Sequence, residues 1–307
     1  MKKILITGAT GNIGFEVIRS LSNSFSQFDV VAGVRNLQKD SRKLIDYKIS
    51  FIRFDFTEIG TYKSALENVN VLFLLRPPQI VEVARYFKPL IRVAKESGIE
   101  HIVFLSVQGV ENNRIIPHNK IEKLIVESGI PYTFLRPAYF MQNFSTTLLN
   151  DLVFKKTIFL PAGNSRFTLI DIRDIGAVAS KILTEPTMHF NKSYELTCNE
   201  KLTFKEMAQI LSDCTEVTIR YQSPDLLNFI LTKRKEKMPL MFILVMIMLH
   251  YFPQFKQEPK ITDWVYKITG RQPFTFQQFV EDNDVLNQLN KMNSNFIKNQ
   301  SDSVERL

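Results

Sequence analysis

The chain has 307 residues, of which 45% are apolar and 23% charged, so it is long enough to bury a substantial core and has the composition of a globular protein. Its net charge of +8 favours anionic partners, but the densest basic run, residues 233–237, is short and contains no aromatic residue. We therefore do not predict nucleic-acid binding. Cys198 and Cys214 form no CxxC pattern, which excludes a disulfide framework and the usual zinc spacings. We expect a reducing, cytoplasmic setting and no metal site.

Two segments raise the question of a membrane. The apolar run that follows Lys2 and Lys3 breaks at Gly8, which is too early for a signal peptide. Residues 239–252 (PLMFILVMIMLHYF) are strongly apolar but are fewer than the roughly 20 residues needed to span a bilayer, and proline stands at both sides. We predict a buried or pocket-lining helix there and no membrane insertion.

The strongest local pattern occupies the first residues of the chain. The apolar run at residues 4–6 is typical of a buried strand, TGATGNIG follows as far as Gly14, and residues 15–21 have the spacing of an amphipathic helix. In such a unit the glycines allow a tight turn, a close approach of the backbone to phosphate, and close packing of the helix on the strand. The helix N-terminus then presents unpaired N–H groups to an anion. We predict a nucleotide-binding site; the alternative is a purely structural glycine turn.

Strands and helices alternate through the first half of the chain. The hydrophobic patterns predict strands at 29–34, 50–54, 69–75, 101–105 and 131–135, and helices at 59–67, 89–97 and 119–128. This alternation is typical of a Rossmann-like α/β fold with a doubly wound parallel sheet.

The pattern is less regular beyond residue 145. A strand is predicted at 192–196, and Thr203 and Glu206 form a capping-box pattern that opens a helix. We expect a dinucleotide-binding domain at 1–148, to which 167–197 returns, and a smaller, mainly helical substrate-binding portion made of 149–166 and 198–282. Residues 283–307 have few apolar anchors and are predicted to be a frayed or disordered tail.

Two strand ends carry residues suited to the adenosine half of a dinucleotide. The second strand ends at Arg35, where an NAD-selective site would have an acidic residue to bind the ribose 2′-hydroxyl. An arginine forms charge-assisted bonds to a 2′-phosphate, so we predict NADPH over NADH; the alternative is a surface arginine. After the third strand, Asp55 and Phe56 are suited to border the adenine, and Asp55 is equally suited to cap the next helix through Thr57.

Several further segments match a known family in order and spacing. They are ILITGATGNIG at 4–14, VRN at 34–36, HIVFLSVQG at 101–109, HNKIEKLIVESG at 118–129, PYTFLRPAYFMQN at 131–143 and TGRQPFTFQQFV at 269–280. Together they resemble the NmrA-like branch of the atypical short-chain dehydrogenases/reductases, particularly the bacterial NADPH-dependent quinone reductases of that branch. The resemblance covers the chain from residue 4 to about residue 280.

The resemblance implies cofactor contacts residue by residue. The positions that would wrap the pyrophosphate are Gly8, Thr10, Gly11, Asn12, Ile13 and Gly14, with Arg35 at the 2′-phosphate. The contact at the end of strand four falls on Leu74, Leu75 and Arg76, where an arginine is unexpected. The loop near the nicotinamide falls on Ala138, Tyr139, Phe140 and Asn143. The Tyr139 and Phe140 rings would stack beside the nicotinamide or, alternatively, pack beneath the substrate-binding portion.

No tyrosine in the chain is followed by lysine four residues later, the pair that most short-chain dehydrogenases use as acid and base. This weakens the hypotheses of alcohol oxidation and sugar epimerisation, both of which need strong proton transfer at the reacting carbon. A quinone that accepts hydride becomes a delocalised anion that water can protonate, so a strict general acid is dispensable.

Four residues remain as catalytic candidates. His118 has a side chain whose ordinary pKa near 6.5 suits proton donation; alternatively, it caps or orients the helix that follows Pro117. Lys120 would contact ribose or substrate, or be solvated. By the resemblance, Ser106 and Tyr139 would approach the nicotinamide or substrate.

We therefore predict an enzyme, an NADPH-dependent oxidoreductase that transfers hydride to a small, apolar, quinone-like or conjugated electrophile. The first alternative is a non-catalytic NADP(H)-binding redox sensor of the NmrA type that acts through a protein partner. The second is a nucleotide-sugar epimerase or reductase. The sequence is compatible with a homodimer.

Overall fold

The computed structural model describes residues 1–24, 26–47, 49–287 and 289. The chain forms two compact units that alternate along the sequence. Among the described residues, the first unit comprises 1–138, 172–197 and 262–273, and the second comprises 139–171, 198–261 and 274–289. Most of the tail predicted at 283–307 lies outside the described residues, and the assignment of a substrate-binding role to the second unit stays a proposal.

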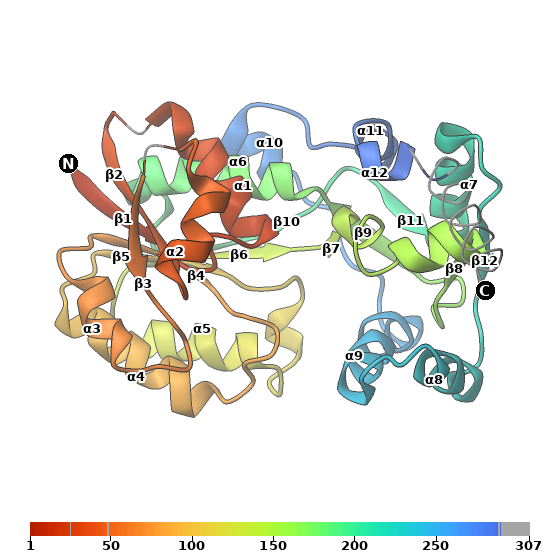
Figure 1. Cartoon of the computed structure of the whole chain (residues 1–307), viewed down its shortest axis with the longest axis horizontal. Helices are drawn as coiled ribbons and strands as arrows, with labels where there is room; N and C mark the ends of the chain where they lie inside the picture. Colours follow the sequence, from red (N-terminus) through yellow and green to blue (C-terminus); the bar gives the residue numbers. More distant parts are fainter. Residues whose placement is uncertain (25, 48, 288, 290–307) are drawn as a thin grey trace, which may run out of the picture. The chain divides into compact units, whose positions relative to one another are not determined.

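The first unit is built on a seven-stranded sheet in which all neighbouring strands are parallel, in the order β10-β6-β5-β4-β1-β2-β3 (Figure 1). The strands are β1 Lys2–Ile6, β2 Phe28–Val34, β3 Ser50–Arg53, β4 Val71–Leu75, β5 His101–Leu105, β6 Tyr132–Pro137 and β10 Lys192–Leu196. The central strands consist of continuous apolar runs because helices cover both faces of the sheet. The predicted Rossmann-like fold class is confirmed.

Helices cover the two faces of this sheet separately (Figure 1). On one face lie α1 Asn12–Leu21, α6 Ile172–Thr184 and α10 Trp264–Thr269, and on the other α3 Thr61–Leu66, α4 Val83–Glu96 and α5 Pro117–Ser128. A short helix, α2 Leu37–Asp40, follows β2. Helices α1 and α6 approach closely at Gly176, where a Cβ atom would lie 2.9 Å from the Glu16 carbonyl oxygen.

Helix α4 begins six residues before the start predicted at Pro89. A proline inside a helix removes one backbone hydrogen bond and costs about 3 kcal/mol, which is why the sequence favoured a start there. In the structure Pro89 lies within the helix, and Val83, Phe87, Leu90 and Ile91 are buried on one face. Burial of these side chains outweighs the local cost, so the predicted boundary was wrong.

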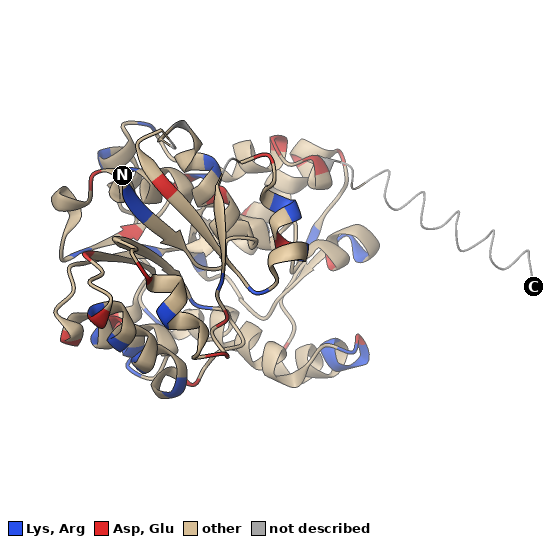
Figure 2. Cartoon of the chain, turned by 60° about the vertical axis from the view of Figure 1, so that its left-hand side comes forward, with Lys and Arg blue, Asp and Glu red and all other residues tan. Residues whose placement is uncertain are grey.

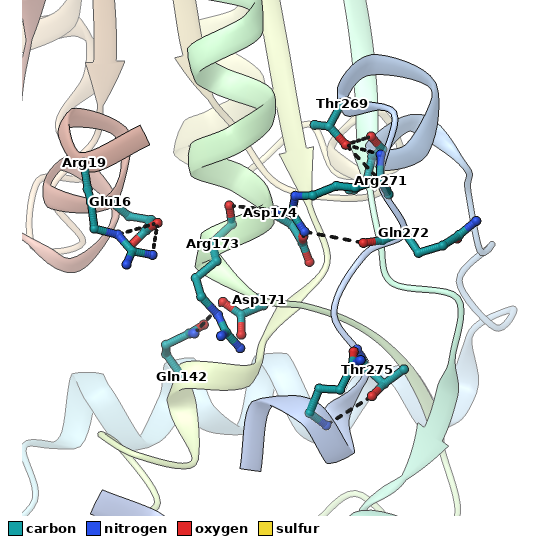
Figure 3. A network of polar contacts seen from close by, with 12 residues as sticks. Glu16, Arg19, Gln142, Asp171, Arg173, Asp174, Thr269, Arg271, Gln272 and Thr275 are labelled. Carbon is teal, nitrogen blue, oxygen red and sulfur yellow. Dashed lines mark hydrogen bonds and ion pairs between the residues drawn. The ribbon is translucent and has the colours of Figure 1, made fainter. Parts of the chain in front are cut away.

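The C-terminal segment of the first unit is held by a buried charge. The carboxylate of Asp174, at the start of α6, is fully buried and lies 2.8 Å from Nη1 of Arg271 (Figure 3). The Arg271 Nη2 group also donates to the carbonyl of Arg173 at 3.3 Å. Arg271 comes from the TGRQPFTFQQFV segment, so this motif serves to fasten residues 262–273 to α6.

The second unit is smaller and mainly helical, with two small sheets. Its strands are β7 Tyr139–Phe140, β9 Arg166–Ile170 and β11 Lys201–Thr203 in one sheet, and β8 Thr157–Phe159 and β12 Arg220–Gln222 in the other. Its helices are α7 Phe204–Thr215, α8 Leu226–Lys235, α9 Leu240–His250, α11 Phe276–Glu281 and α12 Asp284–Asn287, with a π-helical turn at Asp151–Lys155. The predicted capping box at Thr203 and Glu206 is confirmed.

The apolar segment at 239–252 differs from its prediction. Helix α9 buries Ile243, Met246, Ile247 and His250, which share one face, while the opposite face is exposed. The sequence predicted a buried or pocket-lining helix because the segment is apolar on every side, yet the core of the unit covers only one of those sides. The buried alternative therefore holds for one face only, and the pocket-lining alternative stays a prediction. No helix among the described residues combines the length and the hydropathy needed to cross a membrane.

Candidate functional site

The glycine-rich segment after β1 forms a tight turn. Gly8 has a φ of +61°, a conformation that side chains rarely adopt, and its carbonyl accepts a hydrogen bond of 3.0 Å from Gly11 N–H. A Cβ atom on Gly14 would lie 2.3 Å from the same Gly8 carbonyl oxygen, so only glycine fits there. The turn therefore depends on glycine at positions 8 and 14 for separate steric reasons.

This turn leaves the start of α1 open to an anion. The N-cap residue is Gly11, which provides no side-chain cap, and the first turn contains no acidic residue. Gly8, Gly11 and Asn12 are exposed. Unpaired N–H groups and the positive end of the helix dipole suit a pyrophosphate, so the local geometry fits the predicted cofactor segment, Gly8 to Gly14.

Thr7 joins this turn to the end of the neighbouring strand. Its hydroxyl donates to the Phe73 carbonyl at 3.2 Å and accepts from Leu75 N–H at 2.9 Å. Strands β1 and β4 are adjacent at the centre of the sheet, where the strand order reverses direction and ligands bind in this fold. The sequence did not single out Thr7, because its partners are 66 and 68 residues away.

Arg35 follows the last residue of β2 and is exposed. It forms no ion pair within the described parts of the chain. The next residue, Asn36, caps α2 by accepting from Lys39 N–H at 2.9 Å. An exposed guanidinium beside a rigid helix start suits a 2′-phosphate, and this role stays a prediction.

The two residues predicted to border the adenine, Asp55 and Phe56, have different surroundings in the structure. The Asp55 carboxylate accepts hydrogen bonds of 2.8 Å from both the N–H and the hydroxyl of Thr57, which closes a local turn. The next helix, α3, begins at Thr61 with Gly60 as its N-cap and no side-chain cap, so the predicted capping by Asp55 was wrong. Phe56 is only 5% exposed, and its ring packs against Phe54 and Phe87 at centroid distances of 4.8 and 5.3 Å. A ring buried on both sides has no face for adenine, so the geometry does not favour the stacking role predicted for Phe56.

At the end of β4, Arg76 carries a charge without a carboxylate partner among the described residues. Its Nη1 group donates to the carbonyls of Pro77, Pro78 and Ile80 at 3.0 to 3.1 Å, which fixes the guanidinium in place. Its Nε group donates to Nε2 of His118 at 3.3 Å. Burial lowers the pKa of Arg76, although an arginine keeps its charge at neutral pH.

His118 is therefore a hydrogen-bond acceptor. Burial, together with the charge of Arg76, lowers the pKa of its imidazole to about 3. Glu122, which is one turn later in α5, makes two hydrogen bonds to Arg136, at 2.7 and 3.1 Å. Glu122 is therefore engaged with Arg136 and does not stabilise the protonated form of the His118 imidazole. A neutral ring is a poor acid at neutral pH, so the geometry does not favour proton donation by His118. Helix α5 has no side-chain cap, and the contact that His118 makes is with Arg76, a role that the sequence did not predict.

Ser106 and Lys120 have contrasting surroundings. Ser106 follows β5, is 2% exposed, and its Oγ atom has no hydrogen-bond partner in the described structure. Lys120 lies on α5 and is exposed, with no ion pair to any described residue. An unpaired buried hydroxyl is costly and commonly marks a ligand site, whereas an exposed lysine is usually solvated. The roles predicted for both residues stay predictions.

Tyr139 and Asn143 form a polar cluster with His250 inside the second unit. The Nδ1 group of His250 donates to the Met246 carbonyl at 2.7 Å, so its Nε2 atom accepts from the Tyr139 hydroxyl at 3.1 Å. Asn143 also hydrogen-bonds the hydroxyl. Burial raises the pKa of Tyr139 and lowers that of His250 to about 4, so both are neutral. No local pattern in the sequence points to His250, because it follows Tyr139 by 111 residues.

The Tyr139 ring packs against Phe167 and Phe204 at centroid distances of 5.9 and 5.8 Å. This agrees with the alternative in which the ring packs inside the substrate-binding portion. Of the other predicted positions near the cofactor, Leu74 is fully buried, Ala138 ends the first of the three segments of the first unit, and Phe140 belongs to the second unit.

The chain is similar to known proteins over most of its length. The model of the NmrA-like family matches residues 1–263. The NAD(P)H azoreductase of Xenophilus azovorans is 30% identical and is matched over 91% of this chain and 96% of its own length. Prestalk A differentiation protein A of Dictyostelium discoideum is 29% identical over 91% of each chain.

A solved structure supports the fold assignment. The NADPH-dependent quinone oxidoreductase of Escherichia coli, crystallised with NADPH, superposes with a TM-score of 0.79 at 24% identity. The match covers 90% of this chain and 98% of that protein. At this identity the likeness establishes the shared fold.

Proposed function

Because the chain belongs to the NmrA-like family, we propose that it is an NADPH-dependent oxidoreductase that passes hydride to a quinone-like or similarly conjugated electrophile. Family membership confirms the resemblance found in the sequence. The observation that carries the proposal is the fixed, uncompensated charge of Arg76 at the end of β4, beside the phosphate-binding turn.

The first unit supplies the cofactor site in this proposal. The turn from Gly8 to Gly14 holds the pyrophosphate through backbone N–H groups, and Arg35 holds the 2′-phosphate. Bound NADPH supplies the hydride. Leu75 and Arg76 lie at the switch point, where the reactive half of a dinucleotide and the acceptor meet in this fold.

Arg76 supplies electrostatic stabilisation. An acceptor that gains hydride also gains a negative charge, and a positive group fixed before the reaction stabilises that charge without reorganising. The three carbonyls that hold Nη1 keep the guanidinium from swinging into solvent. His118 fixes its other side by accepting from Nε.

The pKa values of the candidate proton donors indicate which class of hydride acceptor suits this site. Neither His118, with its lowered pKa, nor Tyr139, with its raised pKa, is a good acid at neutral pH. The best substrates are therefore electrophiles whose reduced anions are delocalised and take a proton from water, such as quinones, azo compounds and enones.

A redox sensor without turnover is the second candidate. This candidate is favoured because His118 and Tyr139 are poor proton donors at neutral pH and because the chain lacks the tyrosine and lysine pair of most short-chain dehydrogenases. One relative, matched over 91% of each chain, carries the name of a differentiation protein rather than that of an enzyme. A sensor would bind NADP⁺ and NADPH and would form a complex with a protein partner.

The deciding experiment is an anaerobic assay of NADPH oxidation with benzoquinone, menadione, an azo dye and an enone, preceded by titration with NADPH and NADP⁺. We expect turnover with at least one quinone and a preference for NADPH over NADH. Binding of NADPH with no oxidation across the panel would overturn the reductase proposal and leave the sensor. Absence of binding to either dinucleotide would overturn both.

A further inference from the structure

Helix α9 exposes an apolar face where a surface helix normally exposes polar residues. Its buried side packs into the core of the second unit through Ile243, Met246 and Ile247. We call its opposite side the apolar face, which consists of Leu240, Met241, Leu244, Val245, Met248 and Leu249. These side chains are 41 to 71% exposed. Contiguous exposed apolar surface of this kind marks an interaction site.

The apolar face continues beyond the helix. Phe252 and Phe255, in the turn after α9, are 50% and 70% exposed, and Leu231 on the preceding helix α8 is 53% exposed. No charged residue occurs in the sequence from 238 to 255. In Figure 2, α9 accordingly contains no blue or red, and blue residues lie at the neighbouring end of α8.

The residues of the basic cluster at 233–237 differ in burial: Lys233 is buried and paired, whereas the other cations are exposed. Lys233 is buried, and its ammonium lies 2.5 Å from Asp151 and 2.9 Å from Glu236. Glu236 also pairs with Lys155. The single acidic residue of the cluster is therefore paired with two lysines at the surface of the unit, and this network fixes the end of α8 to the π-helical turn.

The charges at the two ends of α9 that lack an ion-pair partner among the described residues are cations. Glu258, which is exposed two residues after Lys256, pairs with Lys201 at 3.0 Å. Arg234, Lys235 and Lys237 are exposed at one end of α9, and Lys256 is exposed at the other. None of the four pairs with a carboxylate within the described structure. An apolar helix bracketed by cations matches the interfacial region of an anionic bilayer, with acyl chains beside the apolar residues and phosphates beside the cations.

We propose that the apolar face and its flanking cations bind the surface of an anionic lipid bilayer. The helix has 11 residues, about half of a span, so it would lie in the interface and not cross it. A second copy is a poorer occupant, because a two-fold interface through this face would bring the same cations together. The proposal concerns the second unit alone and is independent of the reductase chemistry.

The test is co-flotation of the purified full-length protein with vesicles of phosphatidylcholine alone and with 30% phosphatidylglycerol. We expect the protein to float with the anionic vesicles and at least fivefold less with the neutral ones. Leu244→Gln/Met248→Gln and Lys235→Glu/Lys237→Glu should each reduce flotation at least fivefold. All four positions are exposed, and circular dichroism checks that the variants fold.

Matched control variants distinguish binding through the apolar face from nonspecific hydrophobic adsorption and from the effect of net charge. Ile115→Gln removes an apolar side chain that is 83% exposed on the first unit, and Lys95→Glu/Lys123→Glu makes the same charge change there. Both controls should float like the wild type. A Leu249→Trp variant should also show a blue-shifted emission on anionic vesicles.

Failure of the wild-type protein to float with anionic vesicles overturns the proposal. So does an equal loss of flotation in the control variants. A dimer in light scattering that Leu244→Gln/Met248→Gln converts to monomer, without flotation of the wild type, would identify a second copy as the occupant instead.

Discussion

Nε of Arg76 donates a hydrogen bond to Nε2 of His118 at 3.3 Å, so a residue at the end of β4 and a residue in the first turn of α5 act as one unit. The imidazole accepts because burial and the nearby guanidinium keep it neutral. This contact favours a role for His118 as a support of the Arg76 guanidinium over the predicted role as a proton donor.

Replacing Arg76 tests that charge. We expect Arg76→Met to lower kcat/KM for a quinone by about 10- to 100-fold, because the charge that forms on the acceptor loses its counterpart. The Kd for NADPH, measured by fluorescence titration, should change less than about threefold. Arg53→Met, on an exposed arginine paired with Glu58, is the control and should have little effect. A rise in the Kd equal to the loss in kcat/KM would assign Arg76 to the cofactor.

Two substitutions distinguish the roles of His118. A glutamine amide oxygen can accept from Arg76, so His118→Gln should keep kcat/KM within about threefold of the wild type, whereas His118→Leu should lose about tenfold. Because the pKa of His118 is lowered to about 3, the pH profile of kcat should show no inflection near 6.5. Equal losses in both variants, together with such an inflection, would restore the proton-donor role.

Arg35 should determine cofactor preference. A charge-assisted contact to the 2′-phosphate contributes about 1.5–3 kcal/mol, so Arg35→Ala should reduce the ratio of NADPH to NADH affinity by about 10- to 100-fold. Calorimetric titration with both dinucleotides measures this ratio. Arg42→Ala is the control, since Arg42 is another exposed arginine shortly after β2. An unchanged ratio in Arg35→Ala would show that the 2′-phosphate binds elsewhere.

A methyl group at Gly14 should damage the phosphate-binding turn. The added Cβ would lie 2.3 Å from the Gly8 carbonyl, so Gly14→Ala should weaken NADPH binding at least tenfold and lower the free energy of unfolding by about 1–3 kcal/mol. Gly60→Ala is the matched control, because Gly60 has a helical φ of −59° and nothing within 4 Å of its added Cβ. Wild-type binding by Gly14→Ala would contradict the predicted close approach of the turn.

Buried histidines should make the protein less stable in mild acid. The pKa of His250 is about 4 in the folded chain and near 6.5 when unfolded, so the unfolded state binds more protons between these values and stability falls as pH falls. From pH 7 to pH 5 this contributes about 2 kcal/mol, at 1.36 kcal/mol per pH unit below 6.5. Urea unfolding should show a smaller pH dependence in His250→Gln than in the wild type. Tyr139→Phe, which removes the hydrogen bond but not the titrating ring, should keep the wild-type dependence.

The sequence alone determined the features whose physics is local. The strand, turn and helix at residues 4–21 follow from apolar spacing and from glycines that the backbone conformation requires, since Gly8 has a positive φ and Gly14 leaves no room for a side chain. The alternation of apolar patterns likewise determined the fold class, because parallel strands need helices between them. The family followed from these motifs in order.

The tertiary structure decided everything that depends on distant partners. The pKa of His118 depends on its burial and on the charge of Arg76, 42 residues away, and the Tyr139 hydroxyl bonds to His250, 111 residues later. The apolar pattern of α9 could not reveal which side the core would cover, since every side is apolar and burial depends on the packing of other elements. Composition and spacing describe a residue's own preferences, whereas its charge state and exposure are set by the neighbours that folding brings to it.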